Sequence, residues 1–272
     1  FTLYRTHHGP VTHASGNKWV STEKMWDPVK ALQQSFLRTK NSNQKEFHQM
    51  MNIRTNSSNN TVFADADGNI AYYHGNFIPK RDTVFDYKKP VDGSNPKTDW
   101  KGLHELKDNI FLLNPASGWI QNCNSTPFTS AGASSPKPGD YPGYMSYSPE
   151  NYRGIHAISL LSKAKNLTID RMIDLAYDPY LPGAEELIRG LIQAYDSNPL
   201  NNAEMKTAIS LLKNWDFKVS AASKAMTITQ FYLNSYNKSG KIPAGMHLME
   251  KVNYMSSKSP VNERLEIFAA SL

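Results

Sequence analysis

The residues most suited to chemistry lie in one uncharged stretch, residues 114–128, with the sequence NPASGWIQNCNSTPF. It holds the only cysteine of the chain, Cys123, between Asn122 and Asn124. A cysteine thiolate acts as a nucleophile when a histidine base lies beside it in space. The eight histidines are scattered along the chain, and no cysteine-protease pattern surrounds Cys123. We therefore interpret Cys123 as a small packing residue.

The amides of Asn122 and Asn124 suggest a different chemistry, the stabilisation of an oxyanion. An amide donates a hydrogen bond without carrying charge, which suits a negative charge that exists only in the transition state. In an extended segment these two side chains would point to opposite faces, so one of them would point inward. The alternative is that both amides bridge loop backbone, as asparagine commonly does in turns.

Arg153 is a further candidate, because it follows Ser148-Pro149, where we expect a helix to begin. A positive charge in the first turn of a helix opposes the helix dipole, which favours a specific partner such as a carboxylate or a catalytic group. A plain surface role for Arg153 is equally compatible with the sequence.

Metal ligation has weaker support in the sequence. His7, His8 and His13 lack the paired spacing of a zinc-binding helix. The run DADGN at 65–69 is one residue short of an EF-hand loop pattern, and we favour a hairpin turn there. The sequence therefore predicts no metal site in this chain.

Strands and helices must position these residues, and the first half of the chain predicts both. Aromatic and β-branched residues at 2–6 and 18–23 predict a pair of strands around a His-Gly-Pro turn. Asp27 followed by Pro28 predicts the start of a helix. The apolar residues of that helix share one face: Val29, Leu32, Phe36 and Leu37.

The next segment predicts a short helix at about 43–54, which packs Phe47, Met50 and Met51. The run NTVFADADGNIAYYHG that follows is the clearest hairpin signal in the chain. From about 78 to 147 the sequence is rich in Pro, Gly, Ser, Lys and Asp, and so long an irregular stretch is more often functional surface than linker.

The remainder is helical in pattern, with Thr168 as one helix cap. The outline is an α+β chain with a mixed section, 1–147, that carries long loops, and a mainly helical section, 148–272.

Composition limits the class of protein. With 272 residues, 39% apolar, the chain can bury a substantial core. The net charge of +6 is dispersed, because 30 basic residues mix with 24 acidic ones, so we expect no nucleic-acid partner. No segment is long and apolar enough to predict a membrane span. A single cysteine excludes an internal disulfide framework.

Several motifs together resemble the penicillin acylase (penicillin amidase) family of N-terminal-nucleophile hydrolases. They are NNTVFADADGNIAYYHGNFIPKR, DWKGL, NPASGWIQNCNSTPF and NYRGIHAISLL, in this order. LYRTHHGPV and MWDPVKAL before them and LLKNWD after them also fit. Their order matches the family's nucleophile-bearing β subunit, so the resemblance covers most of the chain.

The resemblance implies an αββα N-terminal-nucleophile hydrolase fold, present here in part, made from a self-cleaving precursor. In that family a serine at the new N-terminus attacks an amide carbonyl, its α-amine acts as the base, and an acyl-enzyme forms. Phe1 has no hydroxyl, and the chain opens without Met and closes without a helix stop signal. We therefore expect a piece of a longer polypeptide that begins downstream of its serine and joins the rest of the processed precursor.

The resemblance also implies roles for single residues. Asn124 matches the oxyanion-hole asparagine, and Arg153 matches an arginine that orients the nucleophile. Asn59 falls where the family lines its acyl pocket, often with an apolar residue, and Asn60 matches an asparagine beside it. Phe36 approximates a pocket aromatic. The family often binds calcium, so calcium is conceivable in the full-length enzyme, although no ligand in this chain is matched.

The function implied is hydrolysis of an N-acylated small molecule: a β-lactam, an N-acyl homoserine lactone, or an acylated peptide or lipid. The location implied is the periplasm or the exterior of a bacterium. The alternative is a non-catalytic module that binds substrate or serves as a structural half, with a diverged pseudo-enzyme as a third reading.

Overall fold

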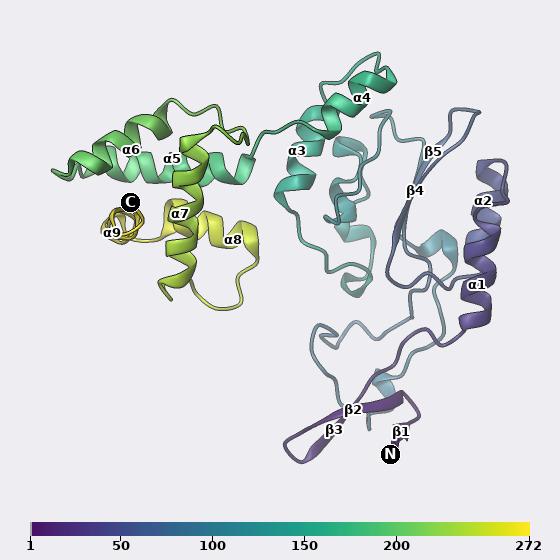
Figure 1. The fold of residues 1–272 in the computed structure, drawn as a ribbon. Coiled ribbons are helices and arrows are strands. Elements are labelled where there is room, and N and C mark those ends of the chain that lie inside the picture. Colours follow the sequence, from purple (N-terminus) through teal and green to yellow (C-terminus); the bar gives the residue numbers. More distant parts are fainter. Residues whose placement is uncertain (1) are drawn as a thin grey trace. The chain divides into compact units, whose positions relative to one another are not determined.

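The computed structural model describes residues 2–272, and the chain divides into compact units, Phe1–Pro149 and Glu150–Leu272 (Figure 1). Small antiparallel sheets lie in the first unit, and helices dominate the second. The chain therefore belongs to the α+β class. Within the described part of the chain, no helix is both long enough and apolar enough to cross a membrane.

The first sheet contains β1 (Arg5–Thr6), β2 (Gly9–Ser15) and β3 (Lys18–Ser21), in that order. The predicted His-Gly-Pro turn is wrong, because the turn is His7-His8 and Gly9-Pro10 opens a strand that the sequence analysis missed. Gly9 has a φ of 139° and lies so close to the backbone that an added Cβ would be 2.2 Å from the Thr22 oxygen. Here the glycine permits close packing beside a strand, and it does not form the turn.

Helix α1 (Pro28–Leu37) begins where predicted, because the Asp27 carboxylate accepts the Lys30 N–H at 3.1 Å. The apolar face of this helix is divided: Leu37 packs against the core of α2, whereas Val29, Leu32 and Phe36 are 75%, 73% and 63% exposed. Gln34 is 1% exposed. The Gln34 carbonyl oxygen accepts hydrogen bonds from the Thr55 N–H and hydroxyl, at 2.9 and 2.7 Å. The inward face of α1 thus carries Gln34, which satisfies these buried donors, together with Leu37.

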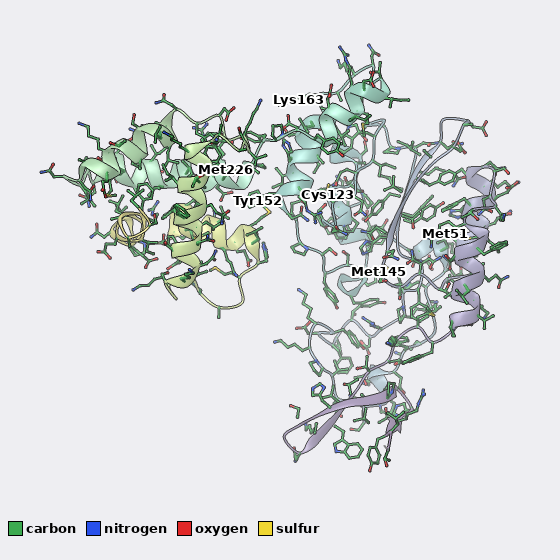
Figure 2. All side chains as sticks on the ribbon, viewed as in Figure 1. Met51, Cys123, Met145, Tyr152, Lys163 and Met226 are labelled. Atoms are coloured by element: carbon green, nitrogen blue, oxygen red, sulfur yellow. The ribbon has the colours of Figure 1, made fainter. Side chains whose placement is uncertain are left out.

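Helix α2 (Gln44–Met51) buries Phe47, Met50 and Met51, as predicted. These side chains form a core cluster with Ala71 and Tyr73 of the hairpin sheet. Met51 is labelled in Figure 2. The contact fixes α2 against the sheet that carries the site described below.

The predicted hairpin is confirmed as β4 (Asn60–Ala64) and β5 (Ile70–His74), and β6 (Phe111–Leu113) pairs with the far side of β5. DADGN forms the turn, in which the Asp65 carboxylate accepts the N–H groups of Asp67 and Asn69 at 3.1 and 2.9 Å. These bonds lower the pKa of Asp65, with the side chain of Asn69 as the largest cause.

The rest of the first unit is irregular, as the sequence predicted, with short 3₁₀ turns. They are η1 (Pro96–Thr98), η2 (Leu106–Asp108), η3 (Pro127–Thr129), η4 (Gly132–Ser134), η5 (Pro138–Asp140) and η6 (Gly143–Met145). Ile78, Ile110 and Met145 form a small core that holds these loops together. Of these residues, Met145 is labelled in Figure 2.

The second unit is helical. Its elements are α3 (Tyr152–Leu161), α4 (Ile169–Ala176), α5 (Pro182–Ser197), α6 (Ala203–Lys213), α7 (Lys224–Lys238), α8 (Leu248–Asn253), a π turn (Tyr254–Lys258) and α9 (Val261–Ala269). The predicted helix start at Ser148-Pro149 is wrong, because Asn151 caps α3 by accepting the Gly154 N–H at 3.0 Å. Thr168 caps α4, as predicted.

The core of the second unit forms where α5 lies against the π turn and α9. Gly190 of α5 meets the Ser256 backbone so closely that a Cβ would lie 2.1 Å from the Ser256 oxygen. The buried Arg264 guanidinium donates to the Gly190 and Ser256 carbonyl oxygens. These bonds join one carbonyl of α5 to one carbonyl of the π turn through the same guanidinium nitrogen.

Candidate functional site

A cavity of about 370 Å³ opens in the first unit, between the hairpin sheet and the irregular loops. Its lining combines amides, hydroxyls, an imidazole and one guanidinium with apolar walls. The polar residues among them are Ser57, Ser58, Asn60, His74, Arg81, Asn124, Tyr144, Tyr147 and Ser148. A groove in the second unit, lined by Ala203, Leu211, Ile228 and neighbours, is shallower and mainly apolar. The first cavity is therefore the better candidate for a site.

Asn60 reaches this cavity from a rigid element. It is the first residue of β4 and pairs with His74 of β5. Its side-chain nitrogen donates to the side-chain oxygen of Asn122 at 3.1 Å. An amide nitrogen carries two N–H groups, so one can anchor the side chain while the other serves a ligand.

Asn124 reaches the same cavity from a loop. The prediction that Asn122 and Asn124 alternate along an extended segment is wrong, because Asn124 has a φ of 54° in the left-handed region, which asparagine tolerates. The Asn124 backbone N–H donates to the Asn122 side-chain oxygen at 3.3 Å. One oxygen of Asn122 thus joins the loop residue Asn124 to the strand residue Asn60.

Arg81 brings a cation to the cavity. Its guanidinium carbon lies 5.1 Å from the centre of the Tyr87 ring and 5.6 Å from that of Trp100, so both rings stabilise its charge. Its Nε is buried with no hydrogen-bond partner among residues 2–272. Arg81 is the charged residue among the described residues that line the cavity, and no carboxylate lies among them. The cavity therefore suits a neutral or anionic ligand.

His74 contributes an imidazole whose Nδ1 lies 3.3 Å from the Tyr72 hydroxyl. Burial lowers the pKa of His74 and favours its neutral form. Nearby, the His104 Nε2 lies 2.9 Å from the Tyr144 hydroxyl, and burial also lowers the pKa of His104. The sequence analysis singled out neither Arg81 nor His74; the signal for both was their position in the run NNTVFADADGNIAYYHGNFIPKR.

Comparison with known proteins identifies the family. The model of the penicillin amidase family matches residues 1–266. This chain belongs to the penicillin amidase family. Penicillin G acylase of Escherichia coli is 34% identical to it over 131 residues, which are 47% of this chain and 15% of that protein. The resemblance seen in the sequence is thus confirmed, and the chain aligns with about 15% of the length of this relative.

The other predicted site residues of this penicillin amidase family member are not among the residues that line the cavity. Asn59 is exposed, and its backbone N–H and carbonyl both bond to the Asn56 side chain. Phe36 is on the open face of α1, with the Lys40 ammonium 5.1 Å from its ring centre. Arg153 is in the first turn of α3, in the second unit. Of the predicted residues, Asn60 and Asn124 are brought together at the cavity.

Proposed function

We propose that this chain forms part of the acyl-transfer site of an amidohydrolase that cleaves an N-acylated substrate. Family membership supports the reaction class. The observation that carries the proposal is that Asn60 and Asn124 line one cavity and share Asn122 as a hydrogen-bond acceptor. In the processed protein, a serine hydroxyl supplied from outside this chain would be the nucleophile.

The proposed reaction has two stages. The serine oxygen attacks the amide carbonyl carbon while the serine α-amine takes the hydroxyl proton, and a tetrahedral oxyanion forms. The C–N bond then breaks, the proton passes to the leaving amine, and an acyl-serine ester remains. Water attacks this ester and releases the carboxylic acid and the free serine. The oxyanion forms in both stages, so donors to it accelerate both.

Asn60 and Asn124 would be these donors, and the two are held differently. Asn60 is half-buried on a paired strand and anchored by Asn122, whereas Asn124 is exposed in a loop. An oxyanion donor is effective when it is preorganised, because no reorganisation is then needed during the reaction. We therefore assign the larger share of the stabilisation to Asn60.

Arg81 would hold the developing negative charge, or a carboxylate of the substrate, through its guanidinium at the cavity wall. The neutral His74 beside Asn60 adds a polar group without adding charge. Arg153 as an orienting residue and Asn59 and Phe36 as acyl-pocket residues remain part of this proposal on the family resemblance alone.

The same resemblance supports the wider assignments. We place residues 1–147 in the αββα core with its active-site loops, and the mainly helical section, 148–272, outside it. The partners would be the α subunit and the N-terminal part of the β subunit, with the enzyme in the periplasm or secreted. The acyl group, the amine and any calcium in the full-length protein stay open within this proposal.

The experiment uses the full-length processed protein and a chromogenic N-acyl anilide. Asn60→Ala should lower kcat by roughly a hundredfold or more, as expected for loss of an oxyanion donor. Asn124→Ala should lower it by less, and Gln33→Ala, at an exposed position of α1 outside the cavity, should leave it near the wild-type value. Wild-type turnover in both Asn60→Ala and Asn124→Ala would refute the site. Binding of the anilide without turnover by the wild-type protein would favour the non-catalytic alternative.

A further inference from the structure

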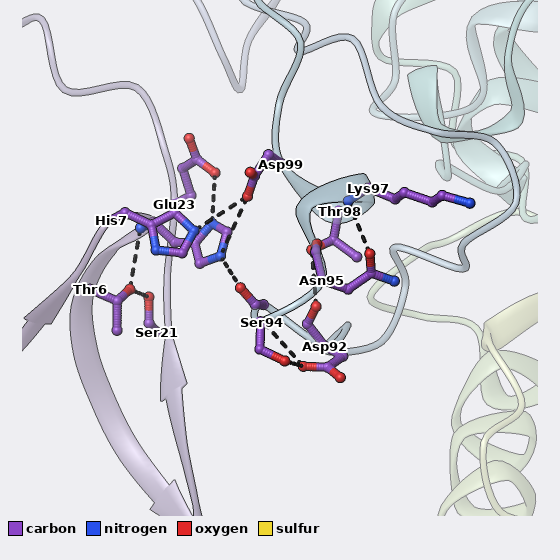
Figure 3. A network of polar contacts seen from close by, with 12 residues as sticks. Thr6, His7, Ser21, Glu23, Asp92, Ser94, Asn95, Lys97, Thr98 and Asp99 are labelled. Atoms are coloured by element: carbon purple, nitrogen blue, oxygen red, sulfur yellow. Dashed lines mark hydrogen bonds and ion pairs between the residues drawn. The ribbon is translucent and has the colours of Figure 1, made fainter.

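A cluster of imidazoles and carboxylates lies in the first unit, built by the first sheet and the loop around η1 (Figure 3). The sequence predicted no metal site, because His7, His8 and His13 lack zinc-helix spacing. The ligand that the sequence could not reveal is Asp99, which is 92 residues from His7 and 3.3 Å from its Nε2. Among residues 2–272, the group of His7, His8 and Asp99 brings its ligand atoms within 4.8 Å of one another.

We propose that His7, His8 and Asp99 bind one divalent transition-metal ion of the zinc type, with Glu23 orienting His8. Zinc bonds to imidazole nitrogen and carboxylate oxygen at about 2.0–2.2 Å, which places neighbouring tetrahedral ligand atoms roughly 3.3 Å apart. The Asp99 oxygen lies 3.3 Å from His7 Nε2 and 3.8 Å from His8 Nε2. Both distances from Asp99 are thus within about half an ångström of the separation expected for tetrahedral ligands.

The two carboxylates make the pocket favourable for a cation. The Glu23 oxygen lies 3.6 Å from His8 Nδ1, on the side of the ring opposite the proposed metal-binding nitrogen. A carboxylate that accepts the outer N–H of a ligating histidine fixes the tautomer and orientation of that ring. A divalent cation there would offset the negative charge of the two carboxylates, Asp99 and Glu23.

The acceptors beside the two ring nitrogens of His8 give a second argument for a metal ion. Its Nε2 lies 2.9 Å from the Gly93 carbonyl oxygen and its Nδ1 faces Glu23, so acceptors lie at both ring nitrogens. A neutral imidazole has a single N–H and serves only one of these acceptors. With the proton on Nδ1 toward Glu23, Nε2 has a lone pair for the metal, and the Gly93 carbonyl becomes a candidate fourth ligand.

The two segments that form the site, the His7-His8 turn and the loop around η1, are held in place before any ion binds. His7 and His8 are adjacent in a hairpin turn, with ring centres 3.8 Å apart, and the His8 N–H donates to the Thr6 hydroxyl at 3.2 Å. On the other wall, Thr98 is buried, and its hydroxyl bonds to the carbonyls of Asp92 and Asn95.

Gly93 permits the close approach of the two walls. A Cβ at this position would lie 2.9 Å from His8 Nε2. The turn of the first sheet and the loop around η1 therefore approach closely at Gly93. A metal ion bound there would cross-link the two segments.

The test is calorimetric titration of ZnCl₂ into the metal-free, full-length processed protein at pH 7.5, with the thermal midpoint followed by circular dichroism. The wild-type chain should bind one zinc ion and melt at a higher temperature with zinc than with EDTA. His7→Ala and Asp99→Asn should each weaken zinc binding at least tenfold. Glu23→Gln should weaken it by about 10–100-fold, as loss of a carboxylate partner does at other sites.

His13→Ala is the matched control, because His13 is an exposed histidine on β2 outside the cluster. It should bind zinc as the wild type does. His7 is itself largely exposed, so His7→Ala should keep the fold and leave zinc binding as the property that changes. No zinc-dependent rise in the melting temperature of the wild type, or unchanged affinity in both His7→Ala and Asp99→Asn, would overturn the proposal.

Discussion

The side-chain amide of Asn60 donates to the side-chain oxygen of Asn122 at 3.1 Å, across 62 residues of sequence. The same oxygen accepts the Asn124 backbone N–H. Asn122 itself is exposed and is not among the residues that line the cavity. Its role is to position the two amides that do line it.

Removal of the Asn122 side chain should therefore reduce catalysis, although Asn122 does not line the cavity. Asn122→Ala in the full-length enzyme should lower kcat about tenfold and change KM little, because the Asn60 amide loses its anchor. Asn122→Ser keeps an oxygen near the Asn124 N–H and should recover part of the loss. The measurement is steady-state kinetics of both variants, and a fall confined to KM would contradict the positioning role.

Gln34 should be essential for the stability of the first unit. Gln34→Ala leaves the buried N–H and hydroxyl of Thr55 without their acceptor, and each unsatisfied buried donor costs about 1–3 kcal/mol. Urea unfolding followed by circular dichroism should show a lower midpoint. The exposed neighbour gives the control: Gln33→Ala should leave the midpoint within error, and equal effects at the two positions would argue against this account.

Stability should fall as the pH drops below about 6.5, the ordinary pKa of histidine. Burial lowers the pKa values of His48, His74 and His104, so the folded chain disfavours their protonated forms. Above that pH these histidines are neutral in both the folded and the unfolded chain, so they do not change the stability. Below it the unfolded chain takes up protons first, and folding is weakened until the pH passes the lowered pKa values.

His74→Asn should therefore reduce the loss of thermal stability between pH 7 and pH 5. The melting temperature at both pH values measures the effect. His13→Asn, at an exposed position, should leave the loss as in the wild type. An unchanged loss in His74→Asn would show that burial of this imidazole does not drive the pH dependence.

Local signals in the sequence predicted local structure well. Asp27 and Thr168 cap the helices that they were expected to cap, since a cap needs only the next three residues. The hairpin at DADGN followed from alternation and turn chemistry alone. The family followed from motifs in a fixed order, which the match over residues 1–266 confirms.

Features set by distant partners were missed. The inward face of α1 depends on Thr55, which lies 21 residues from Gln34, and apolar periodicity carries no information about that bond. The left-handed backbone of Asn124 is the reason that the side chains of Asn122 and Asn124 do not alternate as predicted. Asp99 meets His7 only through the tertiary fold. In each case the deciding interaction is between residues that the sequence does not place together.

The outward apolar stripe of α1, formed by Val29, Leu32 and Phe36, has a practical consequence for anyone who handles this chain. Environment-sensitive dyes of the ANS type fluoresce when they meet exposed apolar surface, and their signal is commonly taken as a sign of lost packing. Here the folded chain already offers such a surface. A bright dye signal at room temperature is therefore expected of well-folded material and should not lead to the rejection of a preparation.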